Sequence, residues 1–288
     1  MAALPVPPAA AAAAVAAAAV TEDEEVVLDD SGDWFDVSLR KGKAGELVVV
    51  KRAKLKWSTV AEALDRDAKV LAAINAAVPL PVRAHLPTFL AYEGGVLVMG
   101  YVRGRQLREF LADGDGHAVT ASVLYDIVRQ VCETLAALQS AFPGFRHRDL
   151  HAGNGLVATD PVHASIIDFG DAGQLAAARG PLPAVDAAAA PVAADVLHLC
   201  ECMLTYLPKG SARHWLAQFC ARISTVGTDV YSDPARYVSA EEASVRCKRA
   251  HTCMADVLRA LEQVSPEAVS RAATSGYWPC CIRRCRRL

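Results

Sequence analysis

The sequence has almost no net charge, because its 30 basic and 32 acidic side chains leave a formal balance of −2 over 288 residues. Such an even balance gives no general attraction to nucleic acid or to an anionic membrane surface. Beyond the Ala-rich residues 1–20, the chain also lacks any run of about 18 or more strongly apolar residues, the length that a membrane span needs. We therefore expect no nucleic-acid partner and no transmembrane segment.

The nine cysteines lack the spacing of a disulfide framework or of a zinc site. Their number is odd and they are scattered, and neither Cys200-x-Cys202 nor Cys280-Cys281 has the usual C-x₂-C form. Cysteines without a framework are typical of reducing compartments. The sequence therefore favours an intracellular protein, in the cytoplasm or the nucleus.

The two ends of the chain differ in composition from the part between them. Residues 1–24 begin with nearly pure Ala, Pro and Val and lack the positive start of a secretory signal, so they predict a disordered leader. Residues 277–288 are rich in Arg and Cys and predict a basic tail, with a lipidated or anionic-surface anchor as the alternative. Residues 25–276 are enough to bury one sizeable core.

Residues 147–170 hold the densest group of chemically useful side chains. The run H-R-D-L-H-A-G-N contains Asp149 and Asn154, and the later run I-I-D-F-G contains Asp168. Phosphoryl transfer needs a carboxylate that accepts the proton of the attacking hydroxyl, and oxygen ligands that hold Mg²⁺ against the nucleotide phosphates. Asp149 suits the first role, and Asn154 and Asp168 suit the second. The apolar residues 165–167 predict a short buried strand that presents Asp168 at its end.

The order and spacing of these two motifs resemble the catalytic loop and metal-binding motif of the protein kinase-like superfamily. The resemblance implies an α+β fold of two lobes, with a small β-rich N-lobe over residues 25–100 and a mostly helical, trimmed C-lobe over residues 104–276. It implies ATP and Mg²⁺ as cofactors, with Asp149 as the catalytic base. It also implies that His151 contacts the γ-phosphate or the substrate, which would make activity sensitive to pH.

Three strands are predicted in the N-terminal part, at Val26–Leu28, Phe35–Leu39 and Leu47–Val50. Lys51 directly follows the last of them, as the phosphate-pairing lysine follows its strand in the family. A helix predicted over residues 60–74 has an apolar stripe that only Asp67 interrupts, and a carboxylate in such a stripe needs a partner. The resemblance implies that Asp67 pairs with Lys51. Since the family has the longer glutamate here, either the helix lies closer or the pair is looser.

The Gly-rich loop that covers the phosphates in the family is degenerate in this sequence. The pattern G-x-G-x-x-G-x-V, counted back from Val37, retains only its middle glycine, Gly32, and places Trp34-Phe35 near the tip. Backbone amides of residues 31–33 could still cradle a phosphate.

A predicted hairpin over residues 89–99 leads into M-G-Y-V-R-G, which resembles the hinge between the lobes of a kinase. In that register Met99 lies at the back of the adenine pocket. Tyr101 and Val102 offer backbone groups to adenine, and Gln106 falls where a ribose-binding side chain often lies.

The C-terminal part predicts helices over residues 119–141, 212–223, 240–264 and 266–273. Asp195 resembles the aspartate that opens the helix bracing the catalytic loop. Residues 171–194 contain no Ser, Thr, Tyr or Glu, so the A-P-E anchor and any phosphorylatable side chain are missing. If the protein is an active enzyme, it should not need loop phosphorylation.

Three functions remain open at this point. Arg148 and the intact D-F-G favour a divergent serine/threonine protein kinase, of the haspin-like or viral type, which acts on a protein bearing Ser or Thr. The form D-L-H-x-G-N also resembles aminoglycoside and choline-type phosphotransferases, with a small-molecule hydroxyl as acceptor. A pseudokinase scaffold is the third alternative, and the presence of Lys51 with the three motif residues argues against it. The oligomeric state is left open, and a viral protein would act within the host cell.

Overall fold

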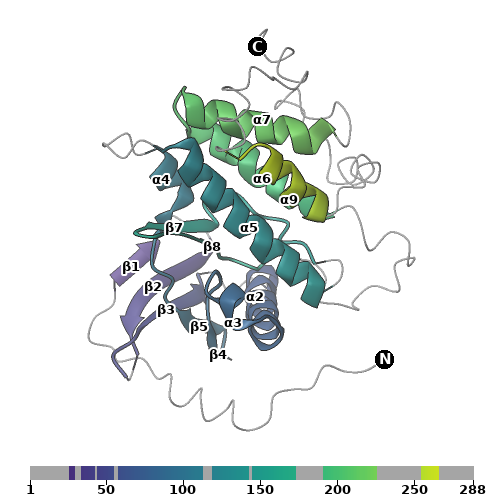
Figure 1. The fold of residues 1–288 in the computed structure, drawn as a ribbon. Helices are drawn as coiled ribbons and strands as arrows, with labels where there is room; N and C mark the ends of the chain where they lie inside the picture. Colours follow the sequence, from purple (N-terminus) through teal and green to yellow (C-terminus); the bar gives the residue numbers. More distant parts are fainter. Residues whose placement is uncertain are drawn as a thin grey trace, which may run out of the picture.

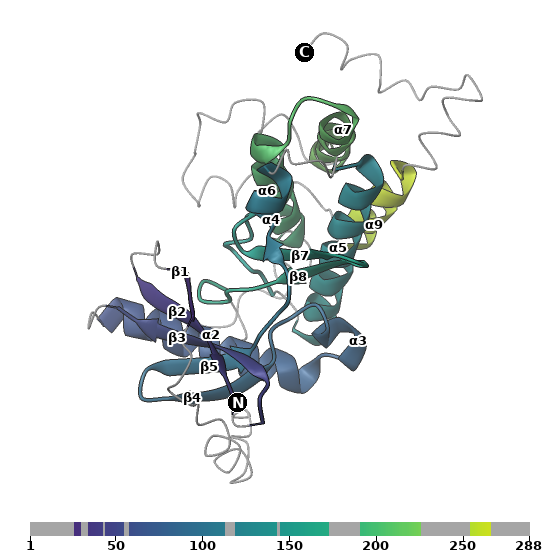
Figure 2. The same ribbon diagram turned by 90° about the vertical axis from the view of Figure 1, so that its left-hand side faces the viewer.

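The computed structural model describes residues 26–29, 34–42, 44–54, 58–112, 119–142, 145–172, 191–225 and 254–265. The predicted leader, the basic tail, Gly32 and the helix predicted over residues 266–273 lie outside these ranges. The described residues form an α+β fold of two lobes, a β-rich N-lobe followed by a mostly helical C-lobe (Figures 1 and 2). The predicted fold class is confirmed.

The N-lobe is built on one antiparallel sheet with the strand order β1-β2-β3-β5-β4. Its strands are β1 (Val26–Asp29), β2 (Phe35–Lys41), β3 (Leu47–Ala53), β4 (Phe89–Glu93) and β5 (Val96–Gly100). The predicted strands are confirmed, with small differences at their ends. Lys51 lies within β3 and not at its end, and the β4–β5 turn is made by Gly94 and Gly95, which have φ of 57° and 77°.

Helix α2 (Ser58–Ala77) packs on the sheet through one part of its apolar stripe and joins the C-lobe core through another. Leu64 and Ala68 are buried against Leu97 of β5, whereas Leu71 and Ile74 belong to the large core of the C-lobe. One helix therefore connects the two cores, and it carries Asp67 between them. The short helix α3 (Leu80–Arg83) follows it and leads into β4.

The C-lobe places a small sheet of order β6-β7-β8 against helices. Its elements are β6 (Arg105–Gln106), α4 (Leu107–Ala112), α5 (Ala121–Ala141), β7 (Gly155–Thr159), β8 (Val162–Ile166), α6 (Pro191–Tyr206), α7 (Ser211–Thr225) and α9 (Met254–Gln263). Helix α5 begins after Thr120, whose hydroxyl accepts a hydrogen bond from the Val123 amide at 3.2 Å. The prediction that Asp195 opens its helix is wrong, because α6 already begins at Pro191.

The remaining predicted helices are present where the structure describes the chain. Helix α7 covers the stretch predicted over residues 212–223, and α9 covers the end of the one predicted over residues 240–264, whose first part lies outside the described ranges. None of the helices in the described part combines the length and the apolar character that crossing a membrane requires.

Candidate active site

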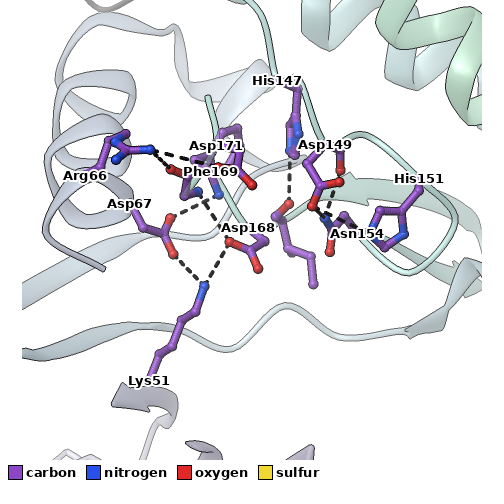
Figure 3. Close-up of polar contacts among 12 residues, drawn as sticks. Lys51, Arg66, Asp67, His147, Asp149, His151, Asn154, Asp168, Phe169 and Asp171 are labelled. Atoms are coloured by element: carbon purple, nitrogen blue, oxygen red, sulfur yellow. Dashed lines mark hydrogen bonds and ion pairs between the residues drawn. The ribbon is translucent and has the colours of Figure 1, made fainter. Parts of the chain in front are cut away.

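Lys51, Asp67 and Asp168 form one cluster at the junction of the lobes (Figure 3). The Lys51 Nζ lies 2.8 Å from Asp67 Oδ2 and 2.8 Å from Asp168 Oδ1. Lys51 comes from β3, Asp67 from α2 and Asp168 from the residues after β8, so three distant segments meet at one ammonium group. The predicted pairing of Lys51 with Asp67 is present, and it is close despite the shorter side chain.

Burial and charge act against each other in this cluster. Lys51 is only 5% exposed, and burial alone would lower its pKa, but the two carboxylates outweigh burial and raise the pKa above its usual value. For Asp168 the signs are reversed. Burial alone would raise the pKa of its carboxyl group, but the ammonium of Lys51 outweighs burial and lowers the pKa. Lys51 is therefore a cation and Asp168 an anion at neutral pH.

Helix α2 also holds the backbone that follows β8. Asp67 Oδ1 accepts a hydrogen bond of 3.0 Å from the Phe169 amide, and Arg66 Nη1 donates to the Gly170 carbonyl at 3.1 Å. These bonds secure Asp168 in a left-handed conformation, with φ of 61°, that residues other than glycine seldom adopt. Asp67 thus bonds both the lysine and the D-F-G backbone.

Asp149 and Asn154 form a second cluster next to the first (Figure 3). The Asn154 Nδ2 donates to the Asp149 carbonyl at 2.8 Å and to Asp149 Oδ2 at 3.1 Å. The Ile167 amide, just before Asp168, donates to the Asn154 carbonyl at 3.0 Å and so ties the two clusters together. The Asp149 side chain is 46% exposed, which leaves its carboxylate open to an incoming hydroxyl.

His151 lies beside Asp149, with its Nε2 at 3.7 Å from Asp149 Oδ2. Its Nδ1 accepts a hydrogen bond of 2.9 Å from the Gly153 amide. A neutral His151 ring must therefore carry its proton on Nε2, the nitrogen nearer to Asp149. A Cβ at Gly153 would lie 2.7 Å from the His151 ring, so a larger residue there would displace the ring from this position.

Asp195 of α6 braces the loop that carries Asp149. Its carboxylate accepts hydrogen bonds from the His147 amide at 2.8 Å and from the Arg148 amide at 3.2 Å. Arg148 has φ of 68°, so the two bonds hold the chain in a strained left-handed conformation directly before Asp149. The predicted brace is present, although Asp195 lies inside α6.

His147 joins the catalytic loop to the core. Burial lowers the pKa of its imidazole, so the ring is neutral, and its Nε2 faces the Ile167 carbonyl at 3.1 Å. The ring packs against Phe169 with centroids 5.1 Å apart. The D-F-G segment is thus fixed from the C-lobe as well as from α2.

Asn154 and Asp168 fit a magnesium ion by the chemistry of their oxygen atoms. Among the described residues, Asn154 Oδ1 and Asp168 Oδ2 have no hydrogen-bond partner, and such oxygens are the ligands that Mg²⁺ prefers. The same ranges contain no group of three or more His, Cys, Asp or Glu that could hold a metal ion. A magnesium ion bound by two protein ligands and by phosphates would suit this sparse donor set.

The residues predicted to bind the nucleotide base and ribose follow β5. Met99, near the end of β5, is half-buried and packs on both the N-lobe and the C-lobe cores. The Tyr101 amide already donates to the Leu47 carbonyl at 3.2 Å, so Tyr101 can offer adenine only its carbonyl. Among described residues the Val102 amide has no such partner. The Gln106 Oε1 is buried without a hydrogen-bond partner within the described part, and a ligand hydroxyl could satisfy it.

Two side chains to which the sequence analysis assigned no role also belong to the site. The ring of Phe35 covers Lys51, with the Nζ 4.5 Å from its centroid, and Arg66 bonds the residues after Phe169. Strand alternation could have indicated Phe35, since it lies on the same face of β2 as Val37, which pairs with Lys51. Arg66 has no comparable signal, because it is an exposed helix residue beside Asp67.

Comparison with known proteins agrees with this geometry. The family model described as protein tyrosine and serine/threonine kinase matches residues 30–180, more than half of the chain. A search of the curated proteins finds no match. The matched residues include the lysine, the helix aspartate, the catalytic loop and the D-F-G motif. The chain therefore belongs to the protein tyrosine and serine/threonine kinase family, whose members are ATP-dependent phosphotransferases.

Proposed function

We propose that this protein is a divergent serine/threonine protein kinase that transfers the γ-phosphate of ATP to a hydroxyl group of another protein. One observation carries the proposal. The cluster of Lys51 and Asp168 lies directly beside the pair of Asp149 and Asn154, joined by the bond from the Ile167 amide to the Asn154 carbonyl. Side chains that can bind phosphate, hold a metal ion and accept a proton are thus brought together in one site.

Lys51 binds and orients the α- and β-phosphates in this proposal. The ammonium is already fixed by two carboxylates at 2.8 Å, so little side-chain entropy is lost when phosphates arrive. Asp168 and Asn154 would hold Mg²⁺, which neutralises charge on the phosphates when it is bound. Adenine lies against Met99 and uses the Tyr101 carbonyl and the Val102 amide.

Asp149 accepts the proton of the attacking hydroxyl. Its carboxylate is half-exposed and is held by the Asn154 amide at 3.1 Å, so it is both reachable and oriented. His151 contacts the γ-phosphate or the substrate, and the position of its Nε2 near Asp149 supports that role.

The proposed enzyme does not need a phosphorylated loop, since residues 171–194 contain no Ser, Thr or Tyr that could be phosphorylated. Bonds from Asp67 and Arg66 to residues 169–170 hold α2 against the D-F-G segment, and Asp195 holds the backbone at Arg148. In kinases that depend on loop phosphorylation, new arginine–phosphate pairs do this work. These contacts support the expectation that activity does not need that modification.

Family membership favours a protein as the acceptor. Arg148 and the intact D-F-G motif support Ser or Thr as the residue that receives the phosphate. An intracellular location remains part of the proposal, and the free thiols of Cys132 and Cys202 support it, because such thiols suit a reducing compartment.

The test is transfer of labelled γ-phosphate from Mg·ATP to a mixed set of acceptors: basic and acidic proteins, histones, an aminoglycoside and choline. We expect label on Ser or Thr of a protein and loss of that label with Asp149→Asn. Label on Tyr alone, or on the small molecules alone, would overturn the proposed acceptor. Absence of transfer to every acceptor, together with no binding of Mg·ATP, would overturn the proposed activity.

A further inference from the structure

Phe35 occupies a position that the family pattern reserves for glycine. In G-x-G-x-x-G-x-V the third glycine stands two residues before the valine, and two residues before Val37 stands Phe35. Glycine there lets the backbone lie close over the phosphates, whereas this chain has an aromatic ring. The replacement therefore changes the part of the site that meets the nucleotide phosphates.

The strand register brings the Phe35 ring to Lys51. Phe35 pairs with Ala53 across β2 and β3, and Val37 pairs with Lys51, so Phe35 lies diagonal to Lys51 on the same face of the sheet. Aromatic and long side chains interact at this diagonal distance. The Nζ of Lys51 lies 4.5 Å from the centroid of the ring, within the range of a cation–π contact.

Three neighbours then surround the Lys51 ammonium. Asp67 and Asp168 each lie at 2.8 Å, and the Phe35 ring covers a further side. The lysine is only 5% exposed. Both carboxylates are hydrogen-bonded to the ammonium, and Asp67 also to the Phe169 amide, whereas the neutral, half-buried ring makes no hydrogen bond. The ring is therefore the neighbour that can give way to a phosphate oxygen.

The Phe35 ring also packs on apolar side chains. Phe35 packs on the cluster of Leu64, Ala68 and Leu97, which lies between α2 and the sheet. The same contacts that hold the ring over Lys51 exclude water from the Lys51–Asp67 pair. Phe35 therefore keeps the lysine in place and at the same time obstructs its access to phosphate.

We propose that Phe35 is a specificity-determining residue for the nucleotide phosphates: its ring covers Lys51 in the free protein and leaves that position when a nucleoside triphosphate binds. This inference rests on the proposed function for its second half, the competition between ring and phosphate. Its first half, the cover over Lys51, concerns the free protein alone. The cover makes phosphate binding weaker than it would be with a small residue at position 35.

The experiment uses the full chain and measures both the cover over Lys51 and the competition between the ring and the phosphates. Acylation of Lys51 by an amine-reactive acetylating reagent, without nucleotide, is followed by mass spectrometry relative to the exposed Lys69. Affinity for Mg·ATP and for adenosine is measured by calorimetry. The variants are Phe35→Ala and Phe35→Leu, with Tyr206→Ala as the control, because Tyr206 is an aromatic residue at the end of α6 that is 42% exposed and belongs to no part of the site.

In Phe35→Ala we expect the reagent to acylate Lys51 several-fold faster, and we expect the variant to bind Mg·ATP about 3- to 10-fold more tightly than the wild type. Phe35→Leu should lie between Phe35→Ala and the wild type in both quantities. Affinity for adenosine should stay the same, because adenosine has no phosphates. Tyr206→Ala should change neither the acylation of Lys51 nor the affinity for Mg·ATP. Unchanged acylation of Lys51 in a folded Phe35→Ala protein would overturn the cover. Faster acylation with unchanged or weaker Mg·ATP binding would overturn the competition. If Lys51 is acylated faster in Phe35→Ala but neither the wild type nor the variants bind nucleotide, the ring does cover Lys51 and it is the proposed function that is overturned.

Discussion

At the scale of single residues, the site depends on a lysine and an aspartate that are both almost completely buried. The Lys51 and Asp67 side chains are 6% and 3% exposed, and their charged atoms lie 2.8 Å apart. Removing one partner of such a pair leaves an uncompensated charge, at a cost of about 3–5 kcal/mol. Because Asp67 reaches Lys51 at 2.8 Å although it is one methylene shorter than glutamate, its length matches the spacing between α2 and β3.

We predict that Asp67→Glu, which restores the residue typical of the family, lowers the free energy of unfolding by about 1–3 kcal/mol. The added methylene has to fit between α2 and β3, where Asp67 already bonds both Lys51 and the Phe169 amide. Urea unfolding measures the change. Asp65→Glu is the control, since Asp65 lies on the same helix and pairs with the exposed Lys69, and it should stay within about 0.5 kcal/mol of the wild type. A stability of Asp67→Glu equal to the wild type would contradict the tight spacing.

Much of the site could be predicted at this scale, because chemistry and sequence spacing coincide. Asp149, Asn154 and Asp168 lie in short motifs, and Asp67 is conspicuous as a carboxylate in an apolar stripe. The sequence pattern places Phe35 in the phosphate loop, but its contact with Lys51 could not be predicted, since that contact depends on the register of β2 against β3, which the residue pattern does not fix. The hydrogen bond from the Tyr101 amide to the Leu47 carbonyl could not be predicted either, because it is a backbone contact between residues far apart in the sequence.

At the scale of elements, α6 determines the shape of the catalytic loop. Asp195 accepts from two consecutive amides, and the second belongs to Arg148 with its φ of 68°. A left-handed conformation at such a residue costs roughly 1–3 kcal/mol and persists only where surrounding contacts hold it. Helix α6 supplies those contacts.

We predict that Asp195→Asn destabilises the protein by about 2–3 kcal/mol and lowers the rate of transfer. Asparagine keeps one acceptor oxygen, but its NH₂ group would face a second N–H donor. Hydrogen exchange of the His147 and Arg148 amides should become faster, which a general loss of stability alone would not confine to the loop. Asp126→Asn on α5 serves as the comparison, because Asp126 makes only a half-exposed pair with Arg129 at 3.6 Å. Protection of the two amides equal to the wild type would argue against the brace.

Long periodic elements were predictable and short ones were not. Helices α2 and α5 and the N-lobe strands show clear apolar periodicity, whereas α4 has six residues and β6 has two, too few to show any period. Strand β7 follows Asn154 directly and was not expected, since its strand character depends on pairing with β8.

At the scale of the whole molecule, one continuous core runs from the second half of α2 into the C-lobe. It contains Ile74 and Leu86 of the N-lobe together with Leu135 of α5 and Phe169 of the D-F-G segment. The Ile166 amide adds a backbone bond of 3.0 Å to the His85 carbonyl, between the lobes. The position of α2, and with it Asp67, is therefore coupled to the stability of the entire fold.

One carboxyl group on α6 should make that stability depend on pH. Partial burial raises the pKa of Glu201 from an ordinary value of 4.5 to about 7. Between these two pH values Glu201 is protonated in the folded protein and ionised in the unfolded chain. The contribution of Glu201 to the free energy of unfolding is therefore largest below pH 4.5 and falls as pH rises through about 7. Its partial exposure reduces the size of the effect.

We predict that Glu201→Gln, which stays neutral, gains stability relative to the wild type as the pH is raised from about 5 to 8. Urea midpoints at the two pH values give the difference. Thr205→Ser on the same helix changes no ionisable group, so its stability relative to the wild type should be the same at both pH values. A difference between wild type and Glu201→Gln that is the same at both pH values would rule out the titration of this group.

The measurement that tests the central claim most directly is the single-turnover rate of γ-phosphate transfer from saturating Mg·ATP, compared between the wild type and Asp149→Asn. If Asp149 accepts the proton and Lys51 with Asp168 holds the phosphates, the variant should bind Mg·ATP as the wild type does and transfer about 10²- to 10⁴-fold more slowly. Equal rates in the two proteins would contradict the account, because the carboxylate at the centre of the site would then take no part in the reaction.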